Sequence, residues 1–82
     1  MLTWEVEARR ILRAELARAG VGYKTLAVRL AALGLEESEA NLSNKIARGK
    51  FSFVFFLQCM KAIGIKSVDI DTKIDSAVLD KK

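Results

Sequence analysis

Apolar side chains recur at steps of three and four residues from the start of the chain to residue 63, which is the spacing of amphipathic α-helices. The first such stretch, Trp4–Ala19, follows Thr3, whose hydroxyl can cap a helix, and precedes Gly20, a common helix stop. Its apolar residues fall on one face, which we expect to pack against the rest of the protein. They are Trp4, Ala8, Ile11, Leu12, Leu16 and Ala19.

Two further helices follow at short intervals. The stretch Tyr23–Leu33 carries an apolar stripe and ends before Gly34. Ser38 can cap a third helix, Glu39–Arg48, for which Gly49 is the stop. Because a short turn joins them, these two helices are typical of a helix-turn-helix unit.

The fourth helix, Phe53–Ile63, begins after Ser52 and is closed by Gly64. Only Gln58 and Lys61 are polar, so apolar groups surround the helix axis. Such a helix is expected to be buried on more than one side. The core of the domain can cover one side, and a second copy of the chain can cover the other. The sequence therefore predicts a homodimer that this helix helps to form.

An alternating pattern follows the fourth helix. Apolar and polar residues take turns over Val68–Ile74, which is a strand signature, but the chain offers no other convincing strand to pair with it. The segment either pairs with its copy in the homodimer or is a disordered tail, and a short terminal helix that includes Ala77 and Val78 is a further alternative. We divide the chain into a helix-turn-helix domain, residues 1–65, and a C-terminal extension, residues 66–82.

The length of 82 residues leaves room for one domain. Its helices predict an all-α fold, a compact domain of four to five helices with a possible short C-terminal strand. A domain of this size buries only about 60–65% of the surface of its unfolded chain. Because 51% of the residues are hydrophobic, more than a small monomer needs, we expect self-association.

The composition gives little support for catalysis. The chain has no His, the commonest general base and metal ligand, and its single cysteine, Cys59, cannot form an internal disulfide. The apolar neighbours of Cys59 predict a small buried hydrophobe. We therefore expect no enzyme activity and no catalytic residue, and neither a metal, a cofactor nor a small-molecule substrate.

No segment of the chain is typical of secretion or of a membrane span. The N-terminus lacks a basic region followed by an apolar one, and no run approaches the ~18 apolar residues of a spanning helix. We expect a cytoplasmic protein without a membrane partner. The 14 Lys and Arg residues outnumber the 10 Asp and Glu residues, and the resulting net charge of +4 favours polyanionic partners.

Two short motifs lie in the second and third helices. Residues 23–27 read YKTLA, and residues 46–50 read IARGK. The stretch 8–65 resembles the lambda-repressor-like (Cro-type) helix-turn-helix family, in which an xxLAxxL helix precedes a recognition helix that closes in such a turn. The run that begins at residue 41, NLSNKIARGKFS, looks more closely like a small bacterial family of domains of unknown function with the same fold. The resemblance implies a sequence-specific transcriptional regulator that binds double-stranded DNA as a dimer.

The third helix carries the candidate DNA-reading face. Leu42 and Ile46 define its inward side when the helix is wound at about 100° per residue. Asn41, Asn44 and Arg48 then point outward. In the major groove of DNA, asparagine forms paired hydrogen bonds with adenine, and arginine does so with guanine. Surface helices also carry polar residues for solubility alone, and that alternative stays open.

Three lysines are placed to contact DNA phosphates, which give affinity without sequence information. They are Lys24, Lys45 and Lys50. Glu36, Glu37 and Glu39 lie at the start of the third helix, where carboxylates would repel phosphates. These glutamates favour an alternative function, a protein–protein interaction module, such as an adaptor or an antitoxin-like partner, that uses the repressor-like fold without binding DNA.

The arginines of the first helix also allow two interpretations. They are Arg9, Arg10, Arg13 and Arg18. We expect a solvated face on which these arginines pair with Glu5, Glu7 or Glu15. Contact with DNA phosphates is the alternative.

Overall fold

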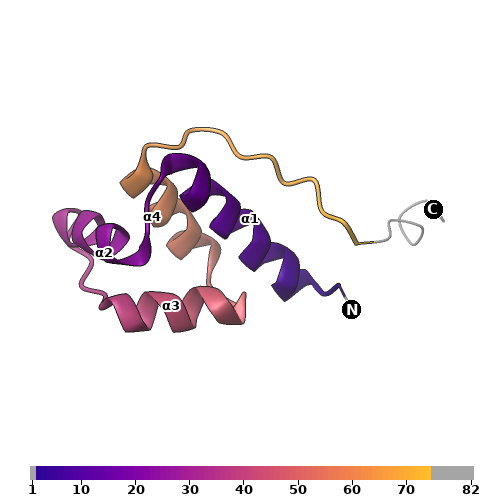
Figure 1. Cartoon of the computed structure of the whole chain (residues 1–82), viewed down its shortest axis with the longest axis horizontal. Coiled ribbons are helices and arrows are strands. Elements are labelled where there is room, and N and C mark those ends of the chain that lie inside the picture. The colour runs from indigo at the N-terminus through magenta and orange to yellow at the C-terminus, as the bar shows by residue number, and fades with distance from the viewer. Residues whose placement is uncertain (1, 75–82) are drawn as a thin grey trace.

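The computed structural model describes residues 2–74, and within that range it contains four α-helices and no strand (Figure 1). The helices are α1 (Trp4–Ala19), α2 (Tyr23–Ala32), α3 (Glu39–Arg48) and α4 (Phe53–Ile63). The predicted all-α fold is therefore confirmed. Three helices have the predicted bounds. The second ends one residue early, because Leu33 is its C-cap and Gly34 takes a positive φ of 86°.

Side-chain caps fix the beginnings of three helices. The hydroxyls of Thr3, Ser38 and Ser52 each accept a hydrogen bond from the backbone N–H three residues later, at 3.0 to 3.1 Å. These bonds satisfy amide groups that have no partner within the helix. The N-cap of α2 is Gly22, which has no side chain to offer. The cap predicted at Ser38 is thus confirmed, and it sets where α3 begins.

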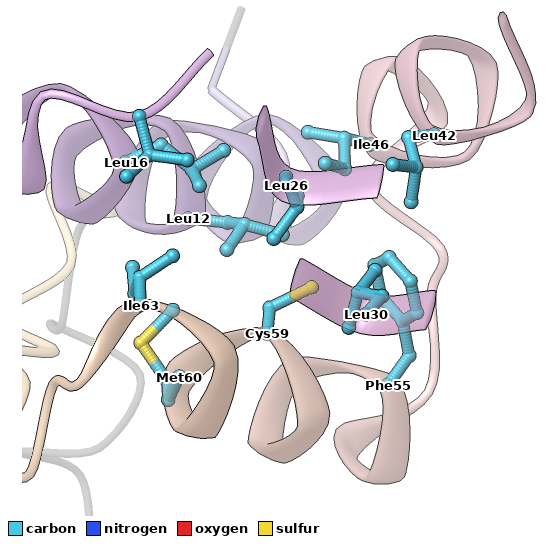
Figure 2. Close-up of a cluster of buried hydrophobic side chains, with 11 residues drawn as sticks. Leu12, Leu16, Leu26, Leu30, Leu42, Ile46, Phe55, Cys59, Met60 and Ile63 are labelled. Atoms are coloured by element: carbon cyan, nitrogen blue, oxygen red, sulfur yellow. The ribbon is translucent and has the colours of Figure 1, made fainter. Parts of the chain in front are cut away.

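All four helices contribute side chains to one hydrophobic core. Figure 2 shows these side chains converging from α1 and α2, from α3, and from α4 on the opposite side. The core residues are Leu12, Leu16, Val21, Leu26, Leu30, Leu42, Ile46, Phe55, Cys59, Met60 and Ile63. Burial of a leucine or isoleucine contributes about 1.5–3 kcal/mol. Because Leu42 and Ile46 are completely buried, the inner face of α3 is fixed against the core.

The C-terminal end of α3 lies directly against the beginning of α1. Gly49, the C-cap of α3, is buried with a φ of 68°, and a Cβ atom placed on it would overlap the backbone carbonyl of Glu5. Nearby, Arg9 Nη1 donates a hydrogen bond to the backbone carbonyl of Ala47 at 3.1 Å. These two contacts hold the end of α3 in a fixed position on α1.

Three residues of α1 differ from the sequence prediction in their exposure to solvent. Trp4, expected on the packed face, is 64% exposed, whereas Glu7 and Glu15 are each only 1% exposed. Glu7 accepts hydrogen bonds from Arg10 Nε at 3.1 Å and Arg10 Nη2 at 3.2 Å, and also from the backbone N–H of Lys73. The helical pattern did not indicate the burial of Glu7, because Lys73 comes from the far end of the chain.

Residues 65–74, which we call the strap, follow α4 in an extended path and run back along α1 toward its N-terminal end (Figure 1). Val68 packs against the core, and the backbone carbonyl of Asp71 accepts a hydrogen bond from Arg10 Nη2 at 3.0 Å. Within the described residues Val68–Ile74 forms no strand, and the backbone carbonyl of Asp71 and the N–H of Lys73 bond to side chains of α1. Pairing of this segment with a second copy of the chain stays a prediction. The alternative of a short helix at Ala77 and Val78 lies outside the described residues.

We expect Gly49→Ala to destabilise the protein more than Gly64→Ala. Both glycines have a positive φ, 68° and 75°, and an alanine in that conformation costs about 1–2 kcal/mol. Around Gly64 no atom lies within 4 Å of the added Cβ, whereas at Gly49 the Cβ meets the backbone of Glu5. Overpacking adds roughly 1–3 kcal/mol. Urea denaturation measures both free energies of unfolding, and equal values would contradict the close contact.

We also expect acid to weaken the attachment of the strap to α1. The Arg10 guanidinium and the Lys73 backbone N–H lower the pKa of Glu7 below its ordinary value of 4.5. The ionised carboxylate therefore stabilises the fold above that value, and this contribution is lost as the pH falls through the lower, folded-state pKa. Glu7→Gln should lower the Tm at neutral pH, and the difference from wild type should shrink in acid.

Thermal denaturation at a series of pH values tests this expectation. Glu5→Gln is the matched control, because it removes the same charge from a partly exposed side chain of the same helix turn. A Glu7→Gln protein with the Tm of wild type at pH 7 would show that the carboxylate does not hold the strap.

Candidate nucleic-acid interface

The outer face of α3 carries the polar residues that the sequence pattern placed there. Asn41, Asn44 and Arg48 are exposed, while Leu42 and Ile46 on the opposite side are completely buried. In Figure 1 no other ribbon covers the lower side of α3. A helix anchored on one face and open on the other presents its outer side chains at fixed positions.

These outer side chains line a groove of about 610 Å³ beside α3 and the segment that joins it to α4. The lining residues are Glu37, Asn41, Asn44, Lys45, Arg48, Lys50, Phe51, Ser52 and Phe55. Five of the six residues predicted to contact DNA are thus brought together. The sixth, Lys24, is exposed in the first turn of α2 and does not line the groove.

Lys45 is engaged within the domain. Its Nζ lies 2.6 Å from Glu37 Oε2 and 4.7 Å from the centre of the Phe55 ring. The side chain is 39% exposed and that of Glu37 is 20% exposed. Sequence reasoning missed this pair, because residues eight apart across a turn and a helix share no helical spacing. Lys45 is accordingly less available for phosphate than the sequence alone implied.

Arg48 and Lys50 supply the exposed positive charge of the groove. Both side chains are exposed, and within residues 2–74 neither forms an ion pair. The amides of Asn41 and Asn44 add hydrogen-bond donors and acceptors beside them. The groove thus combines the chemistry that recognises base edges with cations that attract phosphates.

The arginines of α1 are largely committed to partners inside the domain. Arg10 and Arg18 pair with Glu7 and Glu15, at 3.1 and 2.5 Å, so the predicted pairing of arginines and glutamates is confirmed for these two. Arg13 Nε donates a hydrogen bond to the hydroxyl of a tyrosine of α2 at 3.2 Å. The basic character of α1 is therefore partly compensated, and the groove beside α3 is the better candidate for an anionic partner.

Cys59 has no accessible thiol. It is completely buried in the core, as its apolar neighbours predicted, and burial raises the pKa of the thiol to about 12. A thiolate does not form at neutral pH under these conditions, and the thiolate is the reactive species. Cys59 acts as a packing residue.

The outer face of α4 forms a second notable surface. Phe55, Cys59, Met60 and Ile63 face the core, but Phe53, Val54 and Leu57 are 71%, 62% and 51% exposed. Contiguous exposed apolar surface can serve as a contact surface for another protein. This surface, which we call the α4 patch, consists of Phe53, Val54 and Leu57.

Among the helices of the described part of the chain, none combines the length and the apolar character that crossing a membrane requires.

Together these features define a small all-α domain with a polar, cationic groove on one helix. The chain belongs to the family described as Domain of unknown function (DUF6471), whose model matches residues 4–68. The matched stretch runs from the first residue of α1 into the strap. No curated protein and no solved structure matches the chain. The predicted membership of a small family of unknown function is confirmed, and the likeness to the Cro-type family stays a prediction.

Proposed function

We propose that this protein is a sequence-specific DNA-binding domain, a small transcriptional regulator that acts as a dimer. The observation that carries the proposal is the groove that gathers Asn41, Asn44, Arg48 and Lys50 along the open side of one anchored helix. Asparagine suits adenine and arginine suits guanine in the major groove, and lysine suits phosphate. No other surface of the described residues combines these three kinds of contact.

The contacts that anchor α3 to the rest of the domain support its use as a recognition helix. The major groove of B-DNA, about 12 Å wide, accepts one α-helix. Two buried side chains fix the inner face of α3, and the contact between Gly49 and α1 fixes its end. A helix backbone held in this way loses little freedom on binding, which favours affinity. Lys24, at the beginning of α2, would add a phosphate contact beside the groove.

The α4 patch supports the proposed dimer. A second copy would remove Phe53, Val54 and Leu57 from water, and a two-fold axis pairs the same patch of each protomer. Two recognition helices about 34 Å apart would then enter successive major grooves. In this proposal the partners are double-stranded DNA and a second copy of the chain, the site of action is the bacterial cytoplasm, and no catalysis, cofactor or metal is involved.

We expect purified protein to bind duplex DNA with an affinity that falls as the salt concentration rises. On a duplex selected from a random library, Arg48→Ala should weaken binding by about 1–3 kcal/mol and relax the preference for one base pair. Arg13→Ala is the control, because this exposed arginine of α1 lies outside the groove. Fluorescence anisotropy measures both. If no duplex binds at low ionic strength, the proposal fails.

We expect Val54→Asp to convert the dimer into a monomer, because a carboxylate in the α4 patch cannot be buried against a second copy without a large desolvation cost. Val28→Asp is the matched control, since the exposed fraction of Val28, 66%, is similar to the 62% of Val54, but Val28 lies on α2. Light scattering measures the mass of both variants and of wild type. A monomeric wild type, or dissociation by both substitutions alike, would contradict this role of α4.

The α4 patch also favours a second candidate function. A different protein could occupy it, which would make the chain an interaction module that does not bind DNA. In that case wild type would be monomeric alone and would bind no duplex at low ionic strength. The two measurements described above therefore separate the candidates.

A further inference from the structure

The three glutamates near the beginning of α3 are not equivalent. Glu36 and Glu39 are exposed and do not line the groove. Glu37 is only 20% exposed, lines the groove with Asn41 and Asn44, and is the one that pairs with Lys45. An unpaired carboxylate inside a groove proposed for DNA would repel the phosphates.

The pair with Lys45 changes the charge that Glu37 presents. The ammonium lies 2.6 Å from Glu37 Oε2 and above the Phe55 ring, which attracts cations. Partial shielding from water strengthens the attraction within the pair. The carboxylate is therefore compensated and held in one orientation, and it keeps acceptor capacity, because an ionised carboxylate has about four lone-pair sites and the lysine uses one oxygen.

We propose that Glu37 is a specificity-determining residue that accepts a hydrogen bond from the N4 amino group of a cytosine. Carboxylates are suited to that donor in the major groove. Glu37 lies just before the first turn of α3, and recognition helices contact bases with their N-terminal residues. Lys45 is then a positioning residue that holds Glu37, instead of a phosphate contact. This inference rests on the DNA-binding function proposed above.

The test begins with the duplex that wild type selects from a random library. Every position is then substituted in turn, and the affinities are measured by anisotropy. We expect one position at which replacing cytosine by thymine weakens wild-type binding by roughly tenfold. Glu37→Ala should reduce this discrimination to below about twofold, because the acceptor is gone. Glu36→Ala removes the same charge outside the groove and should keep it.

Three results would overturn the inference. If Glu37→Ala keeps the cytosine preference, another residue recognises that base. If Glu37→Ala tightens binding to all duplexes as Glu36→Ala does, Glu37 is only a repelling charge. If wild type binds no duplex, the proposed function itself fails, and this outcome differs from the first two because there is then no preference to compare.

Lys45→Met provides an independent measurement. A positioning role predicts that this variant loses most of the cytosine discrimination while the slope of log affinity against log salt stays that of wild type. A phosphate contact predicts the reverse, with discrimination kept and the slope reduced by about 0.9. The second result would overturn the role assigned to Lys45. Circular dichroism of each variant confirms that it is folded.

Discussion

The close packing of α3 against α1 is the contact on which the rest of the structure depends. At Gly49 the backbones of the two helices touch without a side chain between them, and Leu42 and Ile46 continue the attachment into the core. Because α3 is fixed at its end and along one side, its remaining side chains can be exposed to solvent while the helix keeps its position. The polar groove exists because hydrophobic burial and one glycine already hold the helix that forms it.

Local chemistry made most of the fold predictable from the sequence. Hydroxyl caps such as Ser38 and glycine stops such as Gly49 act within a few residues, so they fixed the helix bounds to within one position. The outward direction of Asn44 followed from two apolar neighbours on the same helix. Features that depend on neighbours in the sequence could be predicted, and five of the six residues predicted to contact DNA do line the groove.

Long-range partners account for what the sequence did not reveal. Glu7 looked like a surface residue because its cover, Lys73, lies 66 positions away. Trp4 looked like a core residue because it shares the apolar spacing of α1, yet no element within residues 2–74 packs over it closely enough to bury it. The pair of Glu37 and Lys45 joins a turn to a helix, a geometry that no periodicity describes. Only the folded arrangement shows which charges meet.

The strap extends the folding unit beyond the stretch of chain that the family model matches. The family match ends at residue 68, whereas the strap bonds to α1 through Asp71 and Lys73. A chain shortened to the matched stretch would deprive a buried carboxylate of a backbone donor and uncover one side of the longest helix. The boundary of sequence similarity and the boundary of cooperative structure therefore fall at different places, and the second lies at least five residues further along the chain.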